Sequence, residues 1–154
     1  MEKNTRNELI QRYAGGFARV EGALEAISAD ELDNPDADGW TARQVVHHLA
    51  DSEMTSALRL RKLVAEINAV IQGYDEELYA KALYYDARPI EASLLVLRAA
   101  RESTLSILEH LDDDQWARQA WHTESGPYSA ERWLEIYAAH AHDHADQIRR
   151  ARVR

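Results

Sequence analysis

The sequence predicts an all-α fold, a four-helix bundle with two long crossover connections. Only three prolines and six glycines interrupt the 154 residues. Apolar residues recur every three or four positions rather than at alternate positions, as expected for amphipathic helices. The length fits one domain, residues 1–154, that can bury a sizeable core. We therefore expect a single site per chain.

Four segments carry the helical pattern. The first is marked by Leu9, Ile10, Tyr13, Phe17, Val20, Leu24 and Ile27. The second follows Thr41, a suitable N-cap, and its inward residues are Val45, Val46, Leu49, Leu60, Val64 and Ile67. The third opens at Pro89 and carries Ile90, Leu94, Leu97, Leu105 and Leu108. The fourth runs from about Ala130 to the C-terminus.

Two long connections separate the later helices. One spans residues 68–88 and is expected to be partly helical, and the other spans residues 112–129. Connections of this length in a compact domain usually carry structure of their own or serve a function. We therefore expect them to shape any substrate pocket. His110 and His122 show no helical context and are predicted to be surface or loop residues.

Composition excludes several classes of protein. The chain has no cysteine, which excludes disulfides and thiolate metal sites, so any metal must bind nitrogen or oxygen. Its 18 basic and 27 acidic residues give a net charge of −9, which disfavours nucleic acid and anionic membranes as partners. The basic end, "IRRARVR", is interpreted as a cation-rich helix terminus. Without an apolar leader or a membrane span, we expect a cytoplasmic protein.

The stretch "AAHAHDHADQ", residues 138–147, concentrates three histidines in the fourth helix. At about 100° per residue, His140 and His144 lie in the middle of the apolar face. His142 falls on the opposite side beside Glu135 and Asp146, so we expect it in solvent. Two imidazoles one turn apart can converge on one divalent ion. The alternative is two core histidines that hydrogen-bond to neighbouring helices.

The second helix contains "VVHHLADSE", residues 45–53. His47 and His48 both flank its apolar stripe, and His48 lies slightly closer to the centre. Glu53 lies within the stripe, where a carboxylate is costly unless it is paired or hydrogen-bonded. It is either the partner of a buried arginine or tyrosine, or an acid–base group beside a metal.

Three blocks together resemble the DinB/YfiT-like superfamily of metal-dependent hydrolases. They are "GWTARQVVHHLADSEM" (39–54), "GYDEELYA" (73–80) and "YAAHAHDHADQI" (137–148). The similarity extends from about Trp40 to Ile148, and the order and spacing of the blocks agree. The resemblance implies a four-helix bundle, usually a homodimer, with a divalent metal held by three histidines.

Carried over residue by residue, the resemblance implies the metal ligands His48, His140 and His144. The first matches the family pattern H-(I/L)-A-D-x-E, since "HLADSE" begins there, and the other two match its H-x-x-x-H pair. YfiT-like sequences often read "ADSHM" where this chain reads "ADSEM", so Glu53 replaces a histidine. Three imidazoles suit zinc or nickel first, and also iron, manganese or copper.

Three imidazole ligands would leave a divalent ion with an open position, as in catalytic sites. The resemblance implies a metal-dependent hydrolase or, since relatives of this fold are associated with thiol transfer, a low-molecular-weight-thiol S-transferase, in either case acting on a small-molecule substrate. Glu53 would then be a base or would orient a ligand. One alternative is a non-catalytic, stress-related protein that binds a metal or ligand in the same pocket. Another is a structural dimer with a vestigial site.

Overall fold

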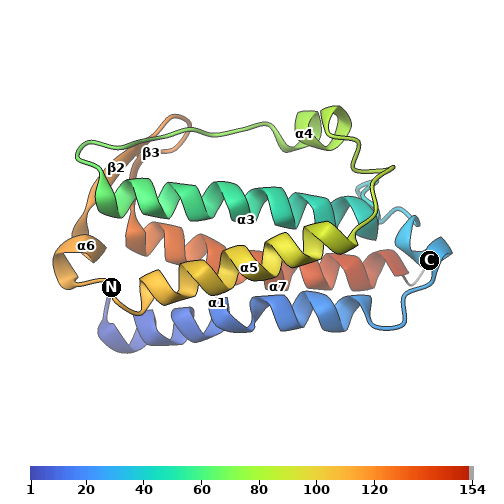
Figure 1. Ribbon diagram of the computed structural model, residues 1–154, viewed down its shortest axis with the longest axis horizontal. Helices are drawn as coiled ribbons and strands as arrows, with labels where there is room; N and C mark the ends of the chain where they lie inside the picture. The colour runs from blue at the N-terminus through green and yellow to red at the C-terminus, as the bar shows by residue number, and fades with distance from the viewer. Residues whose placement is uncertain (153–154) are drawn as a thin grey trace.

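The computed structural model describes residues 1–152 and confirms the four-helix bundle. Its long helices are α1 (Lys3–Leu24), α3 (Ala42–Ala65), α5 (Glu91–Leu108) and α7 (Ala130–Arg152). The chain runs in one direction in α1 and α7 and in the opposite direction in α3 and α5 (Figure 1). The connection from α3 to α5 therefore returns along the length of the bundle. Residues 153–154 of the basic end lie outside the described residues.

Short elements fill the connections. They are α2 (Ala29–Leu32), β1 (Val70–Ile71), α4 (Glu76–Ala82), α6 (Asp113–Ala117), β2 (Gln119–His122) and β3 (Gly126–Ser129). The partly helical connection is confirmed by α4. The small sheet was not predicted: β1 pairs in parallel with β2, and β2 pairs in antiparallel fashion with β3. It fastens the two long connections to each other.

Helix boundaries follow local capping chemistry. The predicted N-cap Thr41 is confirmed, since its hydroxyl accepts from the backbone N–H of Gln44 while the Gln44 side chain accepts from the backbone of Thr41. The third long helix begins at Glu91, slightly after the predicted Pro89. The prediction that Ile67 faces inward is wrong: α3 ends at Ala65, so the helical period stops, and Ile67 is 89% exposed.

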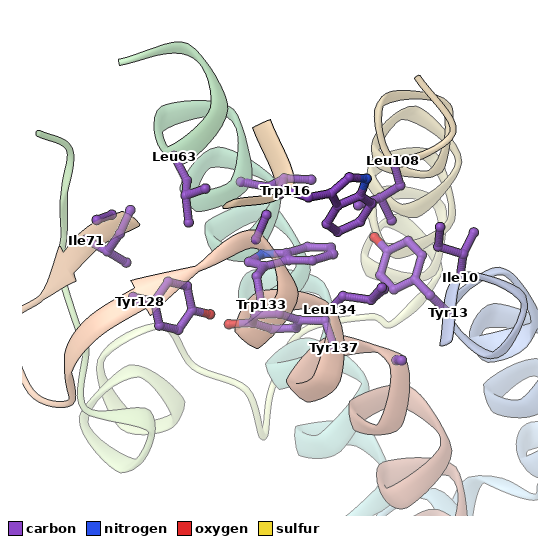
Figure 2. Close-up of a cluster of buried hydrophobic side chains, with 14 of the residues drawn as sticks. Ile10, Tyr13, Leu63, Ile71, Leu108, Trp116, Tyr128, Trp133, Leu134 and Tyr137 are labelled. Atoms are coloured by element: carbon purple, nitrogen blue, oxygen red, sulfur yellow. The ribbon is translucent and has the colours of Figure 1, made fainter. Parts of the chain in front are cut away.

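The apolar core has two parts. One surrounds Trp133, which packs between Tyr13 and Tyr137 (Figure 2) and donates its indole N–H to the carbonyl of Ser56 at 2.8 Å. The other lies toward the C-terminal half of α7, around Ala141, Ala145 and Ile148. Within residues 1–152, every helix is too short or too polar to span a lipid bilayer.

Candidate metal centre

Three histidines from two antiparallel helices converge in the bundle. His48 comes from α3, and His140 and His144 come from α7. One ring nitrogen of each lies within 4.8 Å of those of the other two, and the Nε2 atoms of His48 and His140 are 3.2 Å apart. Two imidazole nitrogens bound to one tetrahedral zinc ion lie ~3.3 Å apart, given Zn–N bonds of ~2.0–2.1 Å. The spacing therefore fits a shared divalent ion.

All three imidazoles are held in the neutral form that binds metals. Burial lowers the pKa of His48 to about 3, with a further contribution from His144. Burial also lowers the pKa of His140 well below its ordinary value, and lowers the pKa of His144. A charged imidazolium is disfavoured at a buried position. The imidazole nitrogens therefore keep lone pairs available for a metal near neutral pH.

A hydrogen-bonded chain orients His144. Its Nδ1 lies 2.7 Å from the amide oxygen of Gln147, whose amide nitrogen donates to Asp36 at 2.8 Å. Because the amide oxygen only accepts, Nδ1 carries the proton and Nε2 keeps its lone pair for the cluster. Sequence reasoning missed Asp36 and Gln147. The position of Gln147 on the apolar face, three residues after His144, was a usable signal, whereas Asp36 in a loop offered none.

The other two helical histidines lie outside the cluster. His142 is half-buried, and a ring nitrogen contacts the backbone carbonyl of Arg12 on α1 at 2.8 Å, so it is less solvent-exposed than predicted. His47 is buried, with Nδ1 2.8 Å from the Ser93 hydroxyl and Nε2 3.1 Å from the Arg88 carbonyl. Adjacent positions on α3 thus face different neighbours, and only His48 joins the α7 pair.

Glu53 is occupied by a buried cation and a phenol. One carboxylate oxygen accepts from Arg101 Nη1 on α5 at 2.5 Å, and the other accepts from the Tyr13 hydroxyl on α1. Arg101 also donates to the Tyr13 carbonyl at 2.7 Å. Burial raises the pKa of Glu53, and the neighbouring guanidinium and phenol oppose that rise. The geometry matches the pairing alternative considered for Glu53.

Arg101 was not singled out from the sequence. Its position could have indicated burial, since it follows the buried Leu97 by four residues on the same face of α5. Gly16 of α1 provides the room that its guanidinium needs: a Cβ there would lie 2.5 Å from Arg101 Nη2. A side chain at this position would displace the cation.

The two remaining histidines differ in their environments. His110 is exposed at the end of α5, as predicted. The prediction for His122 is wrong, because it lies on β2 with only 7% of its surface exposed and its ring against Tyr128. The unpredicted hairpin accounts for the difference.

A cavity of about 240 Å³ opens onto the histidine cluster. Its walls include His48 and His144 from the bundle, Trp40 from the loop before α3, and Glu76 and Glu77 from the start of α4. Helix α4 runs along the outside of the bundle beside α3 (Figure 1) and buries none of its own residues. The candidate centre is therefore reachable by small molecules beneath an external helix.

The fold and the cluster together define a helical-bundle protein with a three-histidine candidate metal centre. The chain belongs to the DinB superfamily, whose family model matches residues 12–148. YfiT of Bacillus subtilis, named a "putative metal-dependent hydrolase", is 31% identical over 150 residues, covering 96% of this chain and 84% of that relative.

Two further comparisons agree. A protein of Oceanobacillus iheyensis with the same designation is 41% identical over 110 residues, or 71% of this chain, and the match spans 63% of that relative's length. The solved structure of Bacillus subtilis YfiT is described as a probable metal-dependent hydrolase with an unusual four-helix bundle topology. It matches with a TM-score of 0.91 at 31% identity, over 98% of this chain and 87% of that one.

Proposed function

We propose that this protein is a metal-dependent enzyme acting on a small molecule, with His48, His140 and His144 as ligands of a divalent ion. The observation that carries the proposal is the convergence of three neutral imidazoles, two of which, His48 and His144, line a cavity. Three protein ligands leave a coordination position open, which is typical of catalytic rather than structural sites. When bound, the ion would supply Lewis acidity toward a coordinated water or thiol.

The surrounding residues have separate parts in this proposal. Gln147 fixes the ring of His144 in the tautomer that presents Nε2. Trp40 packs edge to face with His48 at 5.9 Å between ring centroids and forms an aromatic wall of the cavity. Hydrolysis is the first reaction to test, because relatives are named as hydrolases. Transfer of a low-molecular-weight thiol is the second, as the resemblance implies.

The test begins with elemental analysis of protein purified without a metal-affinity tag. We expect one divalent ion per chain, with zinc or nickel ahead of iron, manganese and copper. The metal-loaded protein is then assayed on a model ester, an amide, and an electrophile supplied with a thiol, with His142→Ala as the matched histidine control. Stoichiometric metal without turnover in any assay would favour the binding-protein alternative, and absence of metal uptake would overturn the proposal.

Two expectations stay predictions: the homodimer that the resemblance implies, and the cytoplasmic location expected from the sequence. The homodimer can be tested by light scattering coupled to size exclusion. The cytoplasmic location can be tested by cell fractionation. Metal stoichiometry should be expressed per chain, whether the protein is a monomer or a dimer.

A further inference from the structure

The cavity beside the three histidines is lined by carboxylates without basic partners. Asp38, Glu76 and Glu77 all line it, and no lysine or arginine does. Within residues 1–152, no ion pair closer than 4.0 Å uses any of the three. No side-chain cation pairs with them directly, so these carboxylates make the electrostatic potential within the cavity more negative.

A second cavity, of about 400 Å³, continues the first outward. The two share Asp38, Trp40 and Glu77 as lining residues, and the outer one adds Asp86 and Lys81. Four carboxylates and one ammonium group thus border the combined space. Its size falls within the range of small-molecule sites, which hold a ligand by apolar contact and a few placed polar groups.

Trp40 supplies an aromatic wall common to both cavities. Its ring lies beside His48, so a molecule that reaches the histidine cluster passes the indole. Aromatic rings attract cations, and tryptophan does so most strongly. Carboxylates and an indole side by side form a surface suited to an organic ammonium group, whereas an anionic ligand would be repelled.

We propose that the substrate carries a positively charged ammonium group, which Glu76, Glu77 and Trp40 hold while its reacting end lies at the histidine cluster. This inference rests on the proposed function, since it assigns the substrate class of the same site. Both glutamates lie at the start of α4, so one short external helix determines the charge preference. The long bundle helices carry the three histidine ligands of the metal, and α4 selects the substrate.

The experiment uses cobalt-loaded protein and three small thiols as probes: cysteamine (cationic), 2-mercaptoethanol (neutral) and 3-mercaptopropionate (anionic). Thiolate binding to cobalt gives a charge-transfer absorption, so dissociation constants are measured without turnover. Because the probes differ in thiol acidity, the readout is the ratio of the cationic to the anionic dissociation constant, compared between wild type and variants. Added salt should reduce the preference for the cation.

Wild type should bind cysteamine more tightly than 3-mercaptopropionate. In the Glu76→Gln/Glu77→Gln variant this preference should fall by roughly fivefold or more, as expected for two exposed charges acting at short range. The matched control is Glu8→Gln/Glu21→Gln, which removes two exposed carboxylates from α1 and should keep the wild-type preference.

Three results would contradict part of this scheme. A preference that is identical in wild type, variant and control would overturn the inference and leave the metal site intact. Loss of stoichiometric cobalt binding in Glu76→Gln/Glu77→Gln would also overturn it, because the carboxylates would then hold metal rather than substrate. Failure of wild type to bind cobalt would instead refute the proposed function itself.

Discussion

Replacing Glu53 by glutamine should destabilise the fold rather than impair chemistry alone. The carboxylate is 1% exposed and accepts from Arg101 and Tyr13, while Arg101 is itself only 3% exposed. Glutamine keeps one acceptor oxygen but turns an amide N–H₂ toward one of these two donors. The guanidinium would be left buried without a counter-charge.

The expected loss follows from that burial. Removing one partner of a buried ion pair costs about 3–5 kcal/mol. For a chain of this size each kcal/mol lowers the melting temperature by about 2–4 °C. We therefore expect Glu53→Gln to melt at least ~6 °C below wild type. Glu102→Gln, which breaks the exposed pair with Arg98 on α5, is the matched control and should melt near the wild-type temperature.

Thermal unfolding and turnover should be measured on the same preparations, together with a double-mutant cycle. Glu53→Leu/Arg101→Leu should be more stable than Arg101→Leu alone, because the double variant leaves no unpaired buried charge. An unchanged melting temperature with turnover reduced about 100-fold, the effect of a lost general base, would refute this reasoning. Glu53 would then act in catalysis.

Three further predictions concern the site and its support. His144→Ala should abolish stoichiometric metal binding and His142→Ala should retain it; elemental analysis decides, and metal that survives the first change would show that the ligands are misassigned. Cobalt spectra should change in His48→Ala and stay unchanged in His47→Ala, although the latter should also lose stability; the reverse pattern would exchange the two roles. Gly16→Ala should lower the free energy of unfolding by about 1–3 kcal/mol through overpacking, because its Cβ would lie 2.5 Å from a buried guanidinium nitrogen. An unshifted urea midpoint would mean that the guanidinium can move aside.

Helical periodicity predicted the bundle and the shared face of His140 and His144, because both depend on geometry within one helix. It could not choose between His47 and His48, since that choice depends on which elements lie on each side of α3. The structure places Ser93 and the Arg88 carbonyl against the first. Periodicity gives an angle around a helix but does not identify its neighbour.

Helical periodicity could not predict the small sheet or the contacts made by the loops. Strands of two to four residues are too short to display a clear alternating pattern. Asp36 reaches Gln147 across 111 positions of sequence, and no local pattern signals such a contact. Arg101 was easier to predict from the sequence, because a cation at core spacing within an apolar helix requires a partner. The buried carboxylate of Glu53 requires a partner for the same reason.

Helix α4 borders the cavity yet contributes no buried residue. Its segment is held on both sides, by the Gly73 N–H bonded to the Thr123 hydroxyl and by the Tyr85 hydroxyl bonded to Asp51. Apart from Tyr74, whose ring lies 5.7 Å from the Arg59 guanidinium of α3, residues between these anchors can change with little effect on the packing of the four long helices. The ligand preference of the protein can therefore change while its four-helix bundle stays the same. Grafting residues 75–84 from another protein of this architecture should therefore transfer that protein's ligand preference and leave the stability of the bundle near that of wild type.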